Sequence, residues 1–573
     1  FREWNLSDEN PDVFLPEETK PWERKKEFHR EDVAGSLRLT LANRLYIETA
    51  NLKPRLQNQL RRMAAIQNPL FYRNQAMGLS NYANSRYLYL GEDDNGFLCI
   101  PRGLLDRVLE RCKEASIPVK IEDLRANGRP LDVKFTGELR DNQQMAVNAM
   151  RPHDCGILSA ATAFGKTVVC SNMIAERKIS TLILLESSAL IEQWQDALER
   201  FLKFGEEPPE YETKSGRKKR RKSVIGIIHG PKDTSTGIMD IAMAGSLCKK
   251  GEFHPRLREY GMVLVDECHH SASDTLRSVL QEVHARYVYG VTATPFRGDG
   301  LEKINEMLLG PVRFQYSAKE KAAEQGIGHY VVPRFTRTVL PFGQEKIHVT
   351  QAYERLRENG SRNELIAADV KRALENGRTP VILTRFTNQA AALYGLLHPF
   401  SQNSFLLTGE MPKKERDAAV RAMANVPPEE SLVLVATGHL VGEGFDFPRL
   451  DTLFLATPVS WKGVVEQYAG RLHRDYPGKK DVIIYDYVDS HIPVFDNMYA
   501  KRLRTYKRIG YTLRTMDAPD KQNANAIYDS DSYRPIFEQD LREAAKSVVI
   551  SSPTLSRKRV EQLLALIRSG QEN

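Results

Sequence analysis

The sequence predicts an α/β protein with two tandem domains, each a parallel sheet flanked by helices, and a smaller α+β region ahead of them. Apolar strands alternate with helical runs in two successive series, one starting near residue 135 and the other near residue 334. Alternation of this kind is typical of parallel sheets with crossover helices. The chain has 573 residues, which is enough for several domains of ordinary size.

The order of the expected elements divides the chain into four parts. We expect an accessory region over residues 1–134, a first α/β domain over 135–333, a second over 334–490, and a helical linker with the start of a further domain over 491–573. The strands that define the two sheets are expected at residues 181–185, 262–265, 287–291, 381–384, 432–437, 452–455 and 482–488. In the accessory region we expect helices within 50–67, a short strand at 98–102 and an amphipathic helix at 104–115.

Aromatic residues are concentrated in the accessory region, between residues 68 and 90. They are Phe71, Tyr72, Tyr82, Tyr87 and Tyr89. Large aromatic side chains are usually part of a core, which is the interpretation that we favour. The alternative is a surface on which nucleic-acid bases stack.

Composition describes an ordinary water-soluble chain, with 41% hydrophobic and 27% charged residues. No apolar run reaches membrane-spanning length and no signal peptide is visible, so we expect no membrane association. The first residue is Phe, which indicates a processed or trimmed chain. None of the six cysteines forms a C-x-x-C pair, which argues against a zinc ribbon and a disulfide framework and favours a cytoplasmic protein. The net charge of +8 permits a nucleic-acid partner without requiring one.

Residues 159–167, S-A-A-T-A-F-G-K-T, have the layout of a phosphate-binding loop, because they follow an apolar strand and precede a helical run over 168–177. Lys166 would reach the β- and γ-phosphates of a nucleotide, and the Thr167 hydroxyl would hold Mg²⁺. The first glycine of the common G-x-x-x-x-G-K-T pattern is Ala160 here. A tight strand–helix turn with a solvated lysine is the alternative. The expected nucleotide-binding residues of the loop are Ala163, Phe164, Gly165, Lys166 and Thr167.

An acidic pair, Asp266-Glu267, follows the apolar strand 262–265 at the end where α/β ligand sites form. Phosphoanhydride hydrolysis needs one carboxylate for Mg²⁺ and one to position or deprotonate the attacking water. We assign Asp266 to the metal and Glu267 to the water. The next two residues, Cys268 and His269, could suggest zinc, but no other ligands stand at a suitable spacing.

Two segments beyond the acidic pair could connect the nucleotide site with the second domain. Thr292 and Thr294 end the next strand and suggest a hydroxyl relay, although the same residues could form a simple turn. Further on, Thr437 and the glycine-rich run 442–446 follow another strand, where glycines allow a backbone to approach a ligand closely.

A later run, Q-Y-A-G-R-L-H-R, places Gln467, Arg471 and Arg474 at helical spacing on one face. Arginines supplied by a second domain can stabilise charge on a transferring γ-phosphoryl group, whereas the alternative is a basic surface helix.

A dense cationic run lies between Pro208-Pro209 and the strand that begins near residue 224. Its members are Arg217, Lys218, Lys219, Arg220, Arg221 and Lys222. We expect it to be a loop insertion, either a solvated surface loop or a contact to a phosphate backbone that releases counterions on binding.

Together these motifs resemble superfamily 2 helicases of the DEAD/DEAH type. The ordered set is L-R-D-N-Q, A-A-T-A-F-G-K-T, D-E-C-H, T-A-T-P, the T-G…G-E-G-F-D segment and Q-Y-A-G-R-L-H-R, and it spans about residues 135–490. The resemblance implies two RecA-like domains with ATP and Mg²⁺ in the cleft between them, and a nucleic-acid strand tracking across their tops. Two positions depart from the usual pattern, Cys268 where Ala is common and Ala163 where Gly is common.

The resemblance also implies roles for individual residues. Gln143 would read adenine, Gln467 would support the γ-phosphate, and Arg471 and Arg474 are candidates for the arginine finger. Further expected nucleotide-site residues are Gly444 and Asp446, and expected nucleic-acid contacts are Ser187, Gln193, Gly230 and Thr437, together with the accessory region 1–134.

A narrower likeness concerns the helicases of TOTE conflict systems, which are prokaryotic anti-invader proteins. It rests on L-A-N-R-L-Y-I-E, A-A-I-Q-N-P-L-F-Y, I-P-R-G-L-L-D and F-T-G-E-L-R between residues 41 and 140. It implies an ATP-driven DNA helicase or translocase in defence against foreign DNA, with nuclease or other defence subunits as partners. The alternatives are a nucleic-acid-stimulated ATPase switch that does not unwind, and an RNA helicase.

The tail 537–567, with V-V-I-S-S-P between two helical runs, is similar to the opening of a phospholipase-D-type nuclease domain. The His-x-Lys-x-x-x-x-Asp signature of that nuclease does not occur in the sequence. We therefore expect its catalytic part to lie beyond Asn573 or to have been lost.

Overall fold

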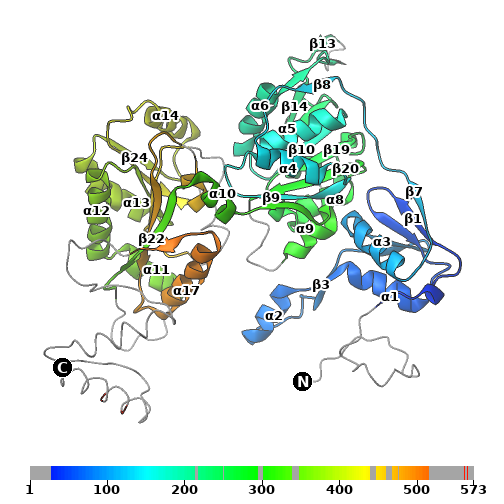
Figure 1. Cartoon of the computed structure of the whole chain (residues 1–573), viewed down its shortest axis with the longest axis horizontal. Coiled ribbons are helices and arrows are strands. Elements are labelled where there is room, and N and C mark those ends of the chain that lie inside the picture. The colour runs from blue at the N-terminus through cyan, green and yellow to red at the C-terminus, as the bar shows by residue number, and fades with distance from the viewer. Residues whose placement is uncertain are drawn as a thin grey trace.

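The fold is described from a computed structural model, which defines residues 27–212, 217–249, 251–293, 301–338, 348–438, 447–459, 468–474, 476–514, 561 and 564. Figure 1 shows an N-terminal unit beside a first α/β domain, with a second α/β domain on the other side of the first. Among the described residues, no helix is both long enough and apolar enough to cross a bilayer.

The elements of the N-terminal unit are β1 (Leu37–Leu41), β2 (Leu45–Glu48), α1 (Pro54–Met63), β3 (Ala65–Gln67), α2 (Pro69–Ala76), β4 (Tyr87–Tyr89), β5 (Glu92–Asp94), β6 (Phe97–Ile100), η2 (Arg102–Leu104), α3 (Leu105–Glu114) and β7 (Val119–Asp123). Its sheet has the order β5-β6-β2-β1-β7, and β3 pairs with β4 separately. The expected helical stretch 50–67 therefore holds α1 and then a short strand.

The elements of the first domain are β8 (Val133–Phe135), α4 (Asp141–Met150), β9 (Cys155–Ala160), α5 (Lys166–Arg177), β10 (Thr181–Leu185), α6 (Ala189–Phe201), β11 (Leu202–Phe204), β12 (Glu210–Glu212), β13 (Lys218–Arg220), β14 (Ile225–His229), β15 (Lys232–Asp233), β16 (Met239–Met243), α7 (Ala244–Leu247), β17 (Cys248–Lys249), β18 (Glu252–Phe253), β19 (Met262–Val265), α8 (Asp274–Gln281), β20 (Tyr287–Thr292), α9 (Glu302–Leu309) and β21 (Val312–Tyr316). The main sheet has the order β15-β14-β16-β10-β19-β20-β9-β21 and is parallel except for β15. Every residue of β9, β10 and β19 is buried, as expected where helices cover both faces.

The second domain is built on a parallel sheet of the order β24-β25-β23-β26-β27-β22-β28. A connecting helix, α10 (Ala318–Gln325), leads into it, and its elements are β22 (Gly328–Phe335), α11 (Val349–Arg357), α12 (Gly360–Glu375), β23 (Pro380–Thr384), α13 (Thr387–Leu397), β24 (Asn403–Leu407), α14 (Lys413–Ala424), β25 (Leu432–Thr437), β26 (Thr452–Leu455), β27 (Asp481–Val488), α17 (Pro493–Arg508) and β28 (Thr512–Leu513). Because β22 pairs with β27 over its whole length, the change of sheet falls before residue 328, earlier than the expected boundary at 333/334.

The observed architecture confirms the α/β fold class with two tandem RecA-like domains and a small N-terminal sheet region. The expected strands of both sheets are present, with ends that shift by no more than a residue. The cationic run 217–222 differs from expectation, because half of it forms β13 of a two-stranded hairpin with β12 rather than a loop.

The N-terminal unit is packed tightly against the first domain. One continuous cluster of buried residues includes Leu37 and Leu98 of the N-terminal sheet together with Val263 of β19. A Cβ atom at Gly103 would lie 2.4 Å from the carbonyl oxygen of Glu306 in α9, so only glycine fits this contact. The accessory region and the first domain thus share a core.

Polar contacts reinforce the same interface. The buried guanidinium group of Arg102 donates hydrogen bonds to the carbonyl oxygens of Val283 at 3.3 Å and Arg286 at 3.0 Å. The Asn43 amide donates to the carbonyl of Gln281 at 2.7 Å. Because both donors sit on the N-terminal unit and both sets of acceptors on the first domain, the orientation of the unit is fixed.

Candidate active site at the phosphate loop

The phosphate loop joins β9 to α5 at the carboxyl edge of the first sheet. Gly165 has a φ of +88°, and a Cβ atom there would lie 2.4 Å from Nε2 of Gln143, so a side chain cannot be accommodated. Ala163 also has a positive φ, +65°, which costs a residue with a side chain about 1–2 kcal/mol. This strain gives a physical reason why glycine is usual at position 163. The turn directs the first N–H groups of α5 toward the loop, as phosphate binding requires.

Lys166 and Thr167 open α5 at this turn. The Lys166 ammonium group donates to the carbonyl oxygen of Ala160 at 3.3 Å, so its side chain folds back over the loop. A lysine held at this position can reach phosphate oxygens on a nucleotide bound at the helix N-terminus.

Gln143 and Arg140 brace the loop from α4. The buried Gln143 amide donates to the Phe164 carbonyl at 2.8 Å and accepts from the Arg140 backbone N–H at 3.0 Å. The Arg140 guanidinium donates to the same Phe164 carbonyl. Gln143 does not line the neighbouring cavity, and its expected role in reading adenine stays a prediction.

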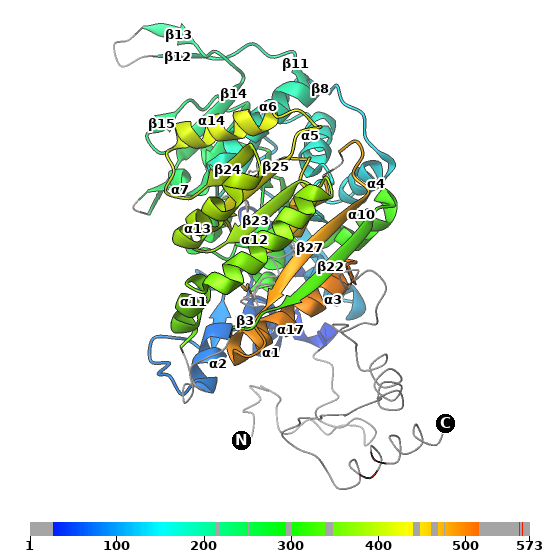
Figure 2. The ribbon, with the colours of Figure 1, turned by 90° about the vertical axis from the view of Figure 1, so that its left-hand side faces the viewer.

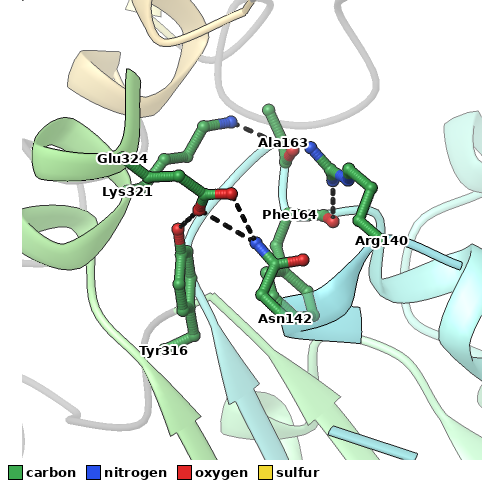
Figure 3. Close-up of a pocket in the computed structure, with 7 residues that line it drawn as sticks. All are labelled: Arg140, Asn142, Ala163, Phe164, Tyr316, Lys321 and Glu324. Carbon is green, nitrogen blue, oxygen red and sulfur yellow. Dashed lines mark hydrogen bonds between the residues drawn. The ribbon is translucent and has the colours of Figure 1, made fainter. Parts of the chain in front are cut away.

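A cavity of about 220 Å³ opens beside the loop. Its lining residues are Arg140, Asn142, Ala163, Phe164, Tyr316, Lys321 and Glu324 (Figure 3). Glu324 accepts hydrogen bonds from Asn142 at 3.0 Å and from the Tyr316 hydroxyl. The lining side chains that come from β21 and α10 belong to none of the sequence motifs. Two of the other lining residues belong to the L-R-D-N-Q motif, which is the signal that could have located this cavity.

The acidic pair lies where β19 ends. The Trp194 indole donates to Asp266 Oδ2 at 2.7 Å, and the Glu267 backbone N–H donates to Asp266 Oδ1 at 2.9 Å. Burial, followed by the negative charge of Glu267, raises the pKa of Asp266 to about 6. A bound cation would favour the ionised form of Asp266, which fits a Mg²⁺ ligand.

Glu267 is held in a different environment. Burial raises its pKa, but a hydrogen bond with His269 and the positive charge of Lys166 outweigh burial, so the pKa falls to about 2. His269 Nδ1 lies 3.2 Å from Glu267 Oε2 and 3.1 Å from Thr292 Oγ1. Thr292 in turn donates to Glu267 Oε2 at 3.4 Å. Glu267 is therefore an ionised, oriented carboxylate, as a group that positions or deprotonates water must be.

His269 is a member of this site that the sequence analysis considered only for zinc. It is buried, and its ring lies tilted against that of His270, with ring centroids 4.1 Å apart. Among the described residues, no group of three His, Cys, Asp or Glu side chains is arranged to hold a metal ion.

The second domain reaches this site through residues 468–474. A Cβ atom at Gly470 would lie 2.5 Å from Thr162 Oγ1 of the phosphate loop, so the backbone at Gly470 approaches the Thr162 side chain closely. The positive charge of Arg471 contributes to the lowered pKa of Glu267. Arg474 lies three residues further on, and its carbonyl oxygen accepts from Lys479 at 2.8 Å. The remaining expected members, Gln467, Gly444, Asp446 and Thr294, lie outside the described residues.

The expected nucleic-acid contacts on the α/β domains follow the carboxyl ends of three strands. Ser187 and the exposed Gln193 follow β10, and Gly230 follows β14 with a φ of +59°. In the second domain, the Thr437 hydroxyl at the end of β25 accepts from the Gly409 N–H at 3.2 Å. Their contact with nucleic acid stays a prediction.

The basic hairpin β12–β13 projects from the first domain, at the top of Figure 1 and Figure 2. Arg220 pairs with Glu207 at 2.9 Å, and Arg221 lies 4.2 Å from the centroid of the Tyr211 ring. Lys218 and Lys219 are exposed. Part of the cationic run therefore stabilises the hairpin, while the lysines face solvent.

Two family models match the chain. One is described as "Type III restriction enzyme, res subunit" and matches residues 136–297, and the other is "Helicase conserved C-terminal domain" and matches residues 363–476. The matched ranges contain the phosphate loop, the acidic pair and the arginine run.

Three relatives illustrate the similarity, each over part of the chain. "Putative helicase 161L" of Invertebrate iridescent virus 6 is 29% identical over 68% of this chain and 85% of its own length. "Putative ATP-dependent RNA helicase L396" of Acanthamoeba polyphaga mimivirus is 22% identical over 76% of this chain and 78% of its own. "DNA 3'-5' translocase XPB2" of Sulfurisphaera tokodaii is 30% identical over 34% of this chain and 39% of its own.

Proposed function

Because this chain is a superfamily 2 helicase and an ATP-dependent hydrolase, we propose that it couples ATP hydrolysis to movement along DNA. The observation that carries the proposal is the approach of Gly470 and Arg471, from the second domain, to the phosphate loop and Glu267 of the first. A nucleotide bound in this cleft would contact both domains. Its binding and hydrolysis would then close and open the cleft, as stepwise movement on a strand requires.

The residues divide the chemistry between them. Lys166 and the N-terminus of α5 bind the phosphates, and Thr167 and Asp266 would hold Mg²⁺, which neutralises charge on the phosphate oxygens. Glu267, oriented by His269 and Thr292, positions the attacking water.

The second domain and the cavity complete the proposed site. Arg471 and Arg474 are the candidates that stabilise charge on the transferred phosphoryl group. The cavity lined by Arg140 and Tyr316 lies beside the loop and would receive the base.

DNA as the substrate is supported by the likeness to the TOTE helicases and by the translocase name of the archaeal relative. The mimivirus relative is named an RNA helicase, which favours RNA as the second candidate. ATPase rates measured with single-stranded DNA, duplex DNA and RNA decide between them. A strand-displacement assay run in parallel separates a helicase from an ATPase switch, since a switch would be stimulated without displacing a strand.

A role in prokaryotic defence against foreign DNA, beside nuclease or other defence subunits, is a finer proposal that rests on the N-terminal sequence passages alone. Protection of a bacterial host against phage by the intact gene, lost in a Lys166→Ala variant, tests it. The nuclease-like tail 537–567 lies outside the described residues, apart from 561 and 564. Metal-independent cleavage of DNA by the native gene product, absent from the 573-residue chain, tests that prediction.

A further inference from the structure

A small projection of the N-terminal unit, formed by residues 65–89 and here named the aromatic finger, has no part in the site described above. It consists of β3, α2, β4 and the segment between α2 and β4, with Ala65, Ile66 and Gln67 opposite Tyr89, Leu88 and Tyr87. The buried Asn68 side chain donates to the Ser85 carbonyl at 2.8 Å, and the Asn81 amide donates to the Phe71 carbonyl at 2.9 Å. Polar contacts to the backbone therefore hold the finger together, and its aromatic residues are not needed as a core.

The tyrosines of the finger are exposed. Tyr82 has a relative exposure of 102%, Tyr87 of 38% and Tyr89 of 42%. On β4, Tyr87 and Tyr89 share one face, while Leu88 between them packs against the buried cluster. The interpretation of these three rings as core residues is therefore wrong. Large exposed rings gathered on one small projection favour a binding surface over a core, because water-exposed apolar area is costly.

Charge identifies the kind of ligand. Residues 65–89, which form the finger itself, contain no Asp or Glu, and their basic residues are Arg73 and Arg86. Of the basic residues ahead of the finger, Arg55 pairs with Asp32 and Arg61 with Asp93. The Arg86 guanidinium lies 5.9 Å from the Tyr72 ring centroid and 5.8 Å from that of Tyr87. Interleaved rings and cations suit a ligand with flat bases and phosphates.

The position of the finger fits such a ligand. In Figure 2, α2 of the finger lies toward the same side of the molecule as α7 and α13. These two helices follow β16 and β23, at the carboxyl edges of the two parallel sheets. A strand crossing both domains on that side would lie on the side of the molecule toward which α2 of the finger extends.

We propose that the aromatic finger binds single-stranded nucleic acid, with bases stacking on Tyr82, Tyr87 and Tyr89 and phosphates contacting Arg73 and Arg86. The proposal deepens the proposed function and rests on its nucleic-acid substrate. Stacking does not discriminate between bases, because every base has a flat face. The finger would hold any unpaired strand, whether DNA or RNA.

The test compares two oligonucleotides that differ only in their bases, oligo(dT) and an abasic oligonucleotide of the same length. Binding of each to the full chain is measured by fluorescence anisotropy without nucleotide. We expect the combined change of Tyr82→Ala and Tyr87→Ala to weaken oligo(dT) binding at least tenfold and to leave abasic binding nearly unchanged. Tyr82→Phe with Tyr87→Phe should restore oligo(dT) binding, since the rings remain. The matched control is Phe400→Ala, an exposed aromatic residue of the second domain. Oligo(rU) repeats the measurement for RNA.

Three outcomes would overturn the proposal. Unchanged oligo(dT) binding in the alanine variant would leave the finger as a docking surface for a protein. Equal losses of affinity for oligo(dT) and the abasic strand would show that the finger contacts only the sugar-phosphate backbone of the strand. Failure of the phenylalanine variant to recover would indicate a folding role. ATP-driven movement is judged separately by DNA-stimulated ATPase of the unaltered chain, so either idea can fail while the other stands.

Discussion

The ammonium group of Lys321 donates a hydrogen bond to the carbonyl oxygen of Ala163, across a distance of 3.0 Å. Lys321 is buried and belongs to α10, the helix that connects the two α/β domains. At its other side, α10 contacts the second domain, where Ala318 packs against the buried cluster and Gly510 approaches Lys319. One helix therefore touches both the phosphate loop and the second domain.

Lys321→Met should uncouple the two domains. The substitution keeps the length of the side chain but removes the hydrogen bonds to the loop. We expect nucleic-acid-stimulated ATPase to fall roughly tenfold, the size of an ordinary coupling energy, with a smaller change in ATP affinity. Lys303→Met, a change at an exposed lysine of α9 in the first domain, is the control. A loss of ATP affinity as large as the loss of turnover would show that Lys321 binds the nucleotide rather than linking the two domains.

Glu267→Gln should separate binding from hydrolysis. The amide keeps the shape of the carboxylate but cannot accept a proton from water, so ATP should bind while turnover stalls. Lys166→Ala should instead weaken ATP binding itself, because the phosphates lose their cation. Equilibrium binding of a fluorescent ATP analogue and single-turnover hydrolysis measure the two effects. Turnover by Glu267→Gln at the unaltered rate would contradict its assignment.

Arg474→Ala should lower turnover by about a thousandfold, the usual effect of removing an arginine finger, with a much smaller change in ATP affinity. Arg471→Ala should also slow hydrolysis, because Arg471 contributes positive charge at Glu267. Steady-state kinetics with saturating DNA compare the two variants. Parallel losses in affinity and turnover, with a lower melting temperature, would indicate a folding role for either residue.

The second domain should lose stability in mild acid through a buried pair of histidines. The rings of His329 and His473 stack with centroids 4.4 Å apart. Burial, followed by the positive charges of Lys321 and Lys479, lowers the pKa of His329 to about 4, and the pKa of His473 is lowered as well. Both rings are therefore neutral in the folded protein and take up protons more readily when it unfolds.

The contribution of this pair to the free energy of unfolding has its full value above about pH 6.5, which is the pKa of histidine in the unfolded chain, and it falls as the pH drops below that value. Because His329 is protonated more readily in the unfolded chain, it alone should lower the free energy of unfolding by about 2 kcal/mol between pH 7.5 and pH 5. Urea unfolding at a series of pH values measures this cost. His329→Gln should flatten the dependence on pH, whereas the exposed His398→Gln should not. Identical slopes for the unaltered chain and His329→Gln would contradict the assignment.

Neutralising the exposed lysines of the basic hairpin, as Lys218→Gln with Lys219→Gln, should weaken DNA binding regardless of sequence. The dependence of affinity on salt should become shallower, because fewer counterions are released. Titrations at several salt concentrations measure the slope. Arg221 should be left in place, since its contact with the Tyr211 ring stabilises the hairpin. An unchanged dependence of DNA affinity on salt would show that these lysines do not contact DNA.

The buried strands could be predicted because short apolar runs between turn signals define parallel strands. The hairpin β12–β13 could not, since charged residues such as Lys218 do not indicate a strand and the hairpin depends on contacts like that between Arg221 and Tyr211. The cavity and the orienting role of His269 depend on distances between residues far apart in sequence. The solvent exposure of Tyr82 could not be predicted either, because the sequence does not reveal whether an aromatic side chain is surrounded by a core.

The contact at Gly103 has a consequence for how movement would be transmitted. Because a side chain cannot fit between η2 and α9, the N-terminal unit cannot slide over the first domain without breaking a shared core. In the proposed function the two would move together, and the second domain would change position relative to them. A ligand bound to the N-terminal unit would therefore keep its position relative to the first domain while the second domain moves. A fragment that begins after residue 134 would lack this unit, and the apolar residues of the first domain that the unit buries would be exposed to water.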